Sequence, residues 1–224
     1  MKLSDVLFLT VRALEPVLIH FLASNLISMI GASMGLHADA ASLTTITAVL
    51  VLPLFLSMMK RDERNGNRRD HEKMPLWMYG AIPVAAVVCN LIATAGLNGI
   101  LQLGESLFGI RISNEVQEGL FLGWLPMQIL GLGILVPIME EVLFRGLVYN
   151  RFRDYNKEWL SVFLGAAVFA VYHGNLIQIL FAFPMGLIIT EVYRRGKTIQ
   201  APVLFHMAVN LSSVLLSYVG GISG

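Results

Sequence analysis

The chain has 224 residues, of which 56% are hydrophobic and only 14% are charged. A water-soluble domain of this length would carry more charge on its surface, so this composition argues against a soluble protein and is typical of a membrane protein. The formal net charge of +1 is uninformative by itself, and the single cysteine, Cys89, excludes an intrachain disulfide and a thiolate zinc cluster.

Apolar segments of roughly 15 to 30 residues recur along the chain, which suits helices that cross a hydrocarbon core about 30 Å thick. The first contains charged residues and Pro16, and we interpret it as a retained span rather than a signal peptide. The segment 98–119 is amphipathic and is predicted to lie along the outer interface or to dip into it. We therefore expect an all-α fold, a multi-pass transmembrane helical bundle that forms a single membrane domain over residues 1–224. About seven spans, and between six and eight, are predicted, at residues 6–29, 41–59, 76–97, 120–149, 159–173, 176–193 and 201–219.

Two charged residues lie within the first span. An ionisable side chain at membrane depth is costly unless it finds a partner. Arg12 and Glu15 are spaced i,i+3, with His20 nearby, and we predict that they form a structural ion pair that faces the bundle. A role in gating substrate entry is the alternative.

Basic side chains gather in three connections, which alternating spans place on one side of the membrane. Because cytoplasmic connections carry an excess of lysine and arginine, we predict a cell-membrane protein with its N-terminus in the cytoplasm and its C-terminus outside. We interpret the first of these connections, residues 60–73, as a solvated loop and expect no binding of nucleic acid. The basic residues are Lys60, Arg61, Arg64, Arg68, Arg69 and Lys73, then Arg151, Arg153 and Lys157, then Arg194, Arg195 and Lys197. The opposite connections carry mainly acids, Asp39, Glu105, Glu115 and Glu118, with Arg111 as the exception.

Two adjacent carboxylates and an arginine interrupt the fourth span, where ionisable side chains are functional candidates by default. Glu141 and Arg145 are spaced i,i+4 with the acid first, which is the favourable order for an ion pair within a helix. Glu140 projects about 100° away from Glu141 and is left to face a different neighbour. The alternative is a helix end at the cytoplasmic interface, where charged residues are common.

Three more polar residues fall within the later spans. His173 ends an apolar run, whereas His206 and Asn210 are spaced i,i+4 on the last span and share one helical face. Either histidine by itself is more often a hydrogen-bonded packing residue than a catalyst. Counted inward from the basic connections, Glu140, His173 and Asn210 lie at about 16, 22 and 15 Å. These similar depths predict that three helices bring their polar groups together.

The chemistry of these groups suits hydrolysis of an amide. A carboxylate such as Glu140 and an imidazole that share one water can activate it as a nucleophile. A second imidazole and a carboxamide on one helix face can donate hydrogen bonds to a developing oxyanion. Glu140, His173 and His206 are also a suitable ligand set for a divalent metal such as zinc, and no other cofactor is expected. The sequence contains no H-E-x-x-H motif and leaves the metal-free and metal-dependent sites both open.

At these residues the chain resembles a known family, the CAAX protease and bacteriocin-processing membrane proteins, also called the Abi family. The family pattern is E-E-x-x-x-R, F-x-x-x-H, F-x-x-G and H-x-x-x-N, in that order. The pattern occurs here as Glu140, Glu141 and Arg145, Phe169 and His173, Phe183 and Gly186, and His206 and Asn210. The resemblance covers roughly residues 120–219 and implies that this segment is the catalytic core of an intramembrane endopeptidase.

The resemblance also implies roles for individual residues. Glu140 and His173 would activate the water, and His206 with Asn210 would hold the oxyanion. Glu141 and Arg145 would give structural support. Members of the family have been described both as metalloproteases and as glutamate-dependent peptidases. The implied partners are membrane lipids and a peptide or protein substrate, with a lipid-anchored protein or a bacteriocin precursor among the options.

Two other classes of function fit the same polar residues. A non-catalytic membrane protein, such as an immunity factor or scaffold, would use the cluster only to bind a peptide or partner. A proton-coupled transporter would use buried glutamate and histidine as a proton relay, but the sequence has no repeated halves. The intact set of four, Glu140, His173, His206 and Asn210, favours an enzyme.

Overall fold

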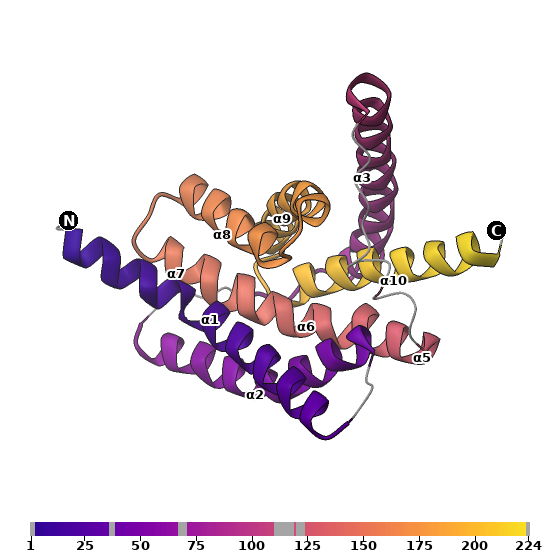
Figure 1. Ribbon diagram of the computed structural model, residues 1–224. Coiled ribbons are helices and arrows are strands. Elements are labelled where there is room, and N and C mark those ends of the chain that lie inside the picture. The colour runs from indigo at the N-terminus through magenta and orange to yellow at the C-terminus, as the bar shows by residue number, and fades with distance from the viewer. Residues whose placement is uncertain (1–2, 36–38, 67–70, 110–118, 120–123, 223–224) are drawn as a thin grey trace.

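The computed structural model describes residues 3–35, 39–66, 71–109, 119 and 124–222, and the regular structure within these residues is helical (Figure 1). A long central helix, residues 125–153, consists of short α-helical and π-helical stretches that follow one another without a break. The elements are α1 (Leu3–Ser33), α2 (Ala40–Arg64), α3 (Met78–Phe108), α5 (Leu125–Met127), η1 (Gln128–Leu135), α6 (Val136–Glu141), η2 (Val142–Tyr149), α7 (Asn150–Arg153), α8 (Glu158–Tyr172), α9 (Leu176–Gly196) and α10 (Gln200–Ile222).

The helices have the lengths and compositions of membrane spans. Six are long and apolar enough to cross a bilayer, and α8 is a shorter apolar helix. The predicted all-α bundle of about seven spans is therefore confirmed. The 15 residues of α8 rise only about 22 Å, which is less than the thickness of a hydrocarbon core of about 30 Å. It stops at His173, where Gly174 takes a left-handed conformation with φ 79° and turns the chain into α9.

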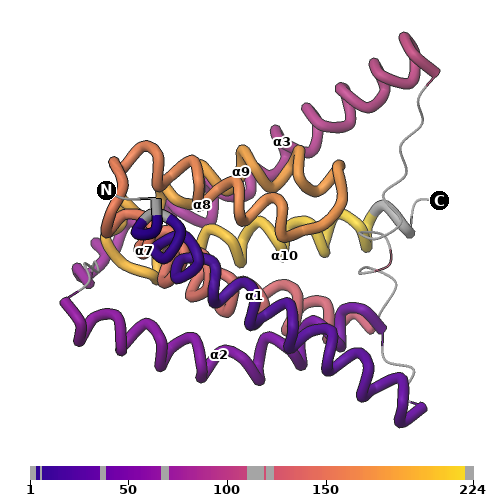
Figure 2. The backbone as a smooth tube through the Cα atoms, turned by 60° about the vertical axis from the view of Figure 1, so that its left-hand side comes forward, coloured from indigo at the N-terminus to yellow at the C-terminus, as the bar shows by residue number. Residues whose placement is uncertain are grey.

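The central helix is the core around which the others pack. It is buried over 67% of its most apolar window, against 11% for α3. In Figures 1 and 2, α1 and α2 lie on one side of it, and α8, α9 and α10 lie on the other. Gly131 permits the closest approach, because a β-carbon there would lie 2.0 Å from the Thr45 hydroxyl of α2. Small residues allow membrane helices to pack this closely.

Helix α3 stands at the edge of the bundle and projects away from it (Figure 2). Its buried Asn90 donates hydrogen bonds to the hydroxyls of Ser212 and Ser213 on α10, at 2.8 and 3.0 Å. The helix continues to Phe108, so residues 98–108 extend the third predicted span as one continuous helix of 31 residues. The helix ends where Gly109 takes a left-handed conformation with φ 65°. The rest of that predicted segment, apart from residue 119, lies outside the described residues.

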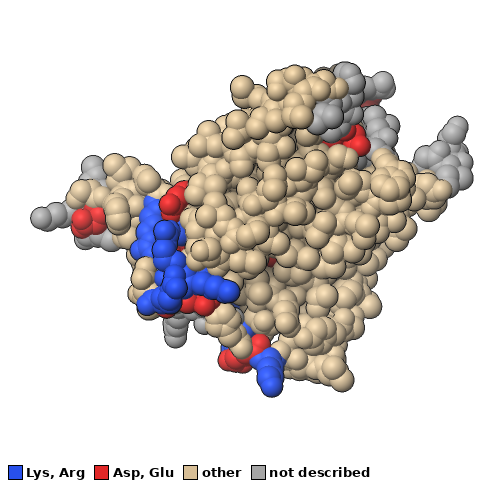
Figure 3. Space-filling view, turned by 90° about the horizontal axis from the view of Figure 1, so that it is seen from below, with Lys and Arg blue, Asp and Glu red and all other residues tan. Residues whose placement is uncertain are grey.

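Lysine and arginine side chains gather at one end of the bundle (Figure 3). This is the arrangement expected if the three basic connections share a side of the membrane, although Arg68, Arg69 and Arg111 lie outside the described residues. Arg151 differs from its neighbours because its side chain is only 2% exposed. It was predicted to lie in a basic connection, and its side chain is instead part of the protein interior.

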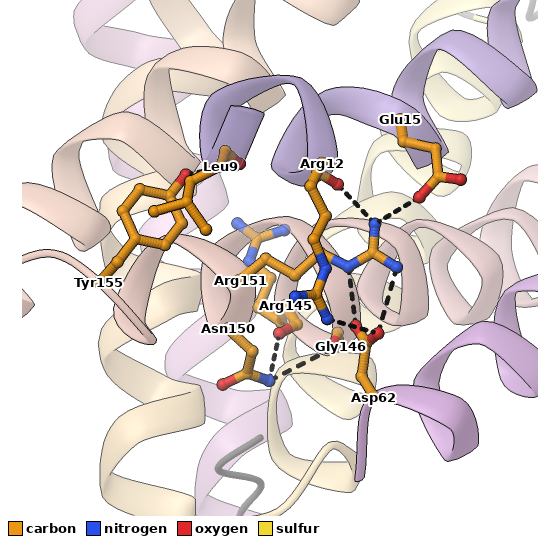
Figure 4. Close-up of polar contacts among 9 residues, drawn as sticks. All are labelled: Leu9, Arg12, Glu15, Asp62, Arg145, Gly146, Asn150, Arg151 and Tyr155. Atoms are coloured by element: carbon orange, nitrogen blue, oxygen red, sulfur yellow. Dashed lines mark hydrogen bonds and ion pairs between the residues drawn. The ribbon is translucent and has the colours of Figure 1, made fainter. Parts of the chain in front are cut away.

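Arg151 is held by acidic groups from two other helices (Figure 4). Its Nε donates to Asp62 Oδ2 of α2 at 2.7 Å, and its Nη1 donates to Glu15 Oε2 of α1 at 3.1 Å. Arg12 also contacts Asp62, at 3.4 Å. The prediction that Arg12 pairs with Glu15 is therefore wrong, because each pairs with another helix. A buried guanidinium requires such partners, since an unpaired charge in the interior is strongly destabilising.

Candidate active site

Glu141 is a fully buried carboxylate that joins two helices. Its Oε1 accepts a hydrogen bond from Arg145 Nη1 at 2.9 Å, within the central helix, and lies 2.7 Å from Nδ1 of His206 on α10. A carboxylate only accepts, so Nδ1 of His206 carries the proton. The predicted Glu141–Arg145 pair is present, and Glu141 also fixes the orientation of His206.

Arg145 extends this cluster to α8 and α9. Its Nη2 donates to the Gly186 carbonyl at 3.1 Å, and its guanidinium lies 4.5 Å from the ring centroid of Phe169. Gly186 allows α9 to approach α8 closely, because a β-carbon there would lie 3.2 Å from the backbone of Ala166. The Phe169 and Gly186 positions of the family pattern thus serve to pack three helices around one buried cation.

Gly186→Ala is expected to destabilise the protein by about 1–3 kcal/mol, because the added methyl group overpacks the contact between α8 and α9. Thermal unfolding of the purified protein in detergent measures this loss. Gly96→Ala is the matched control, since Gly96 lies within α3 with open space around it. That change should be neutral or stabilise by up to about 1 kcal/mol. Equal unfolding temperatures for the two variants would contradict the packing argument.

Glu140 faces away from Glu141 and into a cavity of about 500 Å³. His173, His206 and Asn210 line the same cavity, whereas Glu141 and Arg145 do not. Glu140 Oε2 lies 3.5 Å from Nε2 of His206, so that imidazole stands between the two carboxylates. The structure thus brings the four predicted catalytic residues to one cavity, and the two predicted supporting residues lie outside its lining.

His173 presents one defined nitrogen to this cavity. Its Nδ1 lies 2.8 Å from the Phe169 carbonyl, four residues earlier in α8. A carbonyl only accepts, so Nδ1 is the donor and Nε2 of the neutral ring carries a lone pair. The ring packs edge-on against Phe169, with centroids 4.8 Å apart. Nε2 of His173 is thereby oriented to accept a hydrogen bond from a group in the cavity.

Asn210 is oriented by the central helix. Its Nδ2 donates to the Leu132 carbonyl at 2.9 Å. The π-helical register explains why that carbonyl is available, because Val136 donates to Gly131, five residues back. The corresponding donor for Leu132 would be Pro137, which has no N–H. The amide nitrogen of Asn210 has two hydrogens, so the second remains for a group in the cavity.

The sequence left open a metal site formed by Glu140, His173 and His206, beside a metal-free site. Among the residues that the structure describes, no three side chains of histidine, cysteine, aspartate or glutamate are gathered so that they could hold a metal ion. Both His206 nitrogens face carboxylates in this arrangement. In this arrangement the donor set does not fit a metal ion.

The pair of His20 and Tyr172 was not predicted as part of the site. His20 of α1 is 3% exposed, and its Nδ1 is hydrogen-bonded to the Tyr172 hydroxyl of α8. Both residues line the cavity that contains Glu140. The only signal in the sequence was a histidine within an apolar span, and its partner lies 152 positions away.

Tyr172→Phe is expected to cost about 1–3 kcal/mol, because His20 would be left buried without its hydrogen-bond partner. Chemical denaturation in mild detergent measures the loss. The matched control is Tyr79→Phe, which removes an exposed hydroxyl that donates to Gln200 at 2.9 Å. That control should stay within about 0.5 kcal/mol of the wild type. A Tyr172→Phe protein as stable as the control would show that the buried hydrogen bond contributes little.

Comparisons with known proteins find one matching family model and several relatives. Residues 122–212 match the family model described as type II CAAX prenyl endopeptidase Rce1-like. The chain is 24% identical over 186 residues to "Putative membrane peptidase YdiL" of Bacillus subtilis (strain 168), which covers 81% of this chain and 73% of that protein. It is 32% identical over 144 residues to the "Uncharacterized 24.3 kDa protein" of Escherichia coli, over 62% of each chain. It is 26% identical over 169 residues to the UPF0177 protein YxdF of Lactococcus lactis subsp. lactis (strain IL1403), over 74% of this chain and 90% of that protein. No solved structure matches the chain significantly.

Proposed function

We propose that this chain, which matches the Rce1-like family model over residues 122–212, is an intramembrane endopeptidase of the CAAX protease and bacteriocin-processing family that uses water activated by Glu140 and His173. One observation carries the proposal. Four polar side chains from three helices, Glu140, His173, His206 and Asn210, line a single cavity of about 500 Å³ inside an apolar bundle. Groups of this kind are costly within a membrane and mark functional sites there.

In the proposed reaction, a water in the cavity gives one proton to Glu140, while its other O–H group donates a hydrogen bond to Nε2 of His173. The oxygen attacks the carbonyl carbon of the scissile amide, and the carbonyl oxygen becomes an oxyanion. Glu140 then returns the proton to the amide nitrogen, the C–N bond breaks, and the products are a carboxylic acid and an amine. Each atom and proton is thereby accounted for without a further reactant.

The oxyanion is stabilised by groups on α10. Asn210 supplies its second amide hydrogen, since the first is donated to Leu132. His206 donates through Nε2 when its ring is protonated, because Nδ1 is already directed at Glu141. The buried carboxylate of Glu141 holds that ring in place through Nδ1, as an orienting carboxylate does in hydrolases that use a Ser-His-Asp triad. Arg145 in turn holds Glu141 in place.

The substrate in this proposal is a peptide or protein segment that reaches the cavity within the membrane. A lipid-anchored protein and a bacteriocin-type peptide are the two options that the family suggests. The walls of the cavity are largely apolar, and Phe181, Met185 and Val214 are among the residues that line it. Such walls favour an apolar segment around the scissile bond.

The test is cleavage of a membrane-soluble peptide library by the purified protein in detergent, with the Glu140→Gln variant as the inactive control. Cleavage by the wild type alone supports the proposed function. A parallel reaction with a chelator, followed by addition of zinc, tests metal dependence. Absence of cleavage by folded wild type would overturn the proposal and favour a protein that binds a peptide without cutting it.

A further inference from the structure

The cavity reaches the end of the bundle that is remote from the basic connections. It includes Ala40, the first residue of α2, and Gln178, in the first turn of α9. The basic residues of these two helices, in contrast, lie in their last turns. Ser24 and Asn25 of α1 and Thr44 of α2 line the same part of the cavity, and Asn25 and Ala40 are exposed. We call these five residues the mouth, Ser24, Asn25, Ala40, Thr44 and Gln178.

The opposite direction is closed by buried hydrogen-bonded groups. One layer consists of Glu141, Arg145 and the Gly186 carbonyl. Asn150 forms the next layer, since its Nδ2 donates to the Arg145 carbonyl at 2.7 Å and to the Tyr193 hydroxyl at 2.9 Å. These side chains are at most 2% exposed, so they block the path of a peptide along this part of the central helix from the basic end.

Arg151 and Asp62 complete this closure (Figure 4). They are 2% and 1% exposed, and they tie α7 to α2 beside the basic connections. Opening the bundle there would separate a buried ion pair, which is strongly unfavourable. Access from the mouth requires no such separation.

The mouth carries polar side chains without charge. Ser24, Asn25, Thr44 and Gln178 offer hydroxyl and carboxamide groups, which can pair with the N–H and C=O groups of a peptide backbone. Among the described residues that line the cavity, Glu140 is the only aspartate, glutamate, lysine or arginine. The cavity therefore suits an uncharged peptide segment.

We propose that the substrate is an uncharged peptide segment that enters from the extracytoplasmic side of the membrane, through the mouth formed by α1, α2 and α9. The direction follows from the charge asymmetry, since connections rich in lysine and arginine lie in the cytoplasm and the mouth lies at the other end. The proposal rests on the proposed peptidase function for the nature of the ligand. The sidedness of the cavity can be tested without any activity.

The test uses single cysteines, because the chain has only Cys89. In a Cys89→Ala background, Ser24→Cys places a thiol at the mouth and Arg64→Cys places one at the basic end of α2. A membrane-impermeant maleimide is applied to right-side-out and to inverted membrane vesicles. We expect Ser24→Cys to be labelled in right-side-out vesicles and Arg64→Cys in inverted vesicles, each with loss of labelling in the other preparation.

Two results would overturn the sidedness. Labelling of Ser24→Cys in inverted vesicles alone would place the mouth in the cytoplasm, and labelling in neither preparation, repeated with Asn25→Cys, would show that water does not reach it.

An impermeant fluorogenic peptide then tests entry of substrate. Cleavage in right-side-out vesicles supports the proposal, whereas cleavage in inverted vesicles alone overturns it and leaves the peptidase function standing. If the wild type cleaves nothing in detergent, the peptidase function fails, and the labelling still decides the direction of the mouth.

Discussion

Replacing Glu140 by glutamine is expected to lower the rate of peptide cleavage by about 10²–10⁴-fold, because a carboxamide cannot accept the proton of the attacking water. The shape of the side chain is kept, and its contact with Nε2 of His206 is long, at 3.5 Å, so the fold should not change. The measurement is kcat with a cleaved library peptide, alongside the unfolding temperature in detergent. Peptide binding should persist, since the cavity keeps its size.

Glu141→Gln is the contrasting variant, because Glu141 does not line the cavity and is bonded to Arg145 and His206. We expect it to lose both activity and stability, whereas Glu140→Gln loses activity alone. The catalytic assignment of Glu140 would be wrong if its glutamine variant cleaved at the wild-type rate. It would also be wrong if both variants lost stability equally, since Glu140 would then be another structural carboxylate.

Replacing Arg145 by methionine is expected to destabilise the protein by about 3–5 kcal/mol, because the Glu141 carboxylate would stay buried without its cation. Arg145 is 1% exposed and Glu141 is fully buried, so water cannot take the place of the guanidinium. The change also removes the hydrogen bond to the Gly186 carbonyl and the contact with the Phe169 ring. Chemical unfolding in detergent measures the effect.

The matched control is Arg195→Met, which removes an ion pair to Glu191 whose arginine is 79% exposed. Exposed pairs contribute about 0–1 kcal/mol, so this variant should unfold close to the wild type. In the double variant Glu141→Gln with Arg145→Met, part of the lost stability should return, because no unpaired charge is then buried. Equal effects of Arg145→Met and Arg195→Met would contradict the account of the buried cluster.

Features that depend on neighbouring residues could be predicted from the sequence. The positions of the spans follow from local hydropathy, and the six long helices of the structure overlap six of the predicted spans. The Glu141–Arg145 pair follows from i,i+4 spacing on one helix. Even here, the end of the third span was predicted too early, since its helix continues past residue 97 to Phe108.

Features that join different helices were decided only by the tertiary structure. Nothing in the sequence indicates that His206 bonds to Glu141, 65 positions away, or that Arg151 leaves the basic connection to meet Asp62, 89 positions away. The same is true of the pair of His20 and Tyr172. Such contacts depend on how each helix is rotated about its axis and crosses its neighbours, and many rotations satisfy the same hydropathy. The sequence by itself therefore determined a membrane bundle with polar groups at similar depth. The packing of the helices determined which of those groups face the cavity, which support it, and at which end it opens.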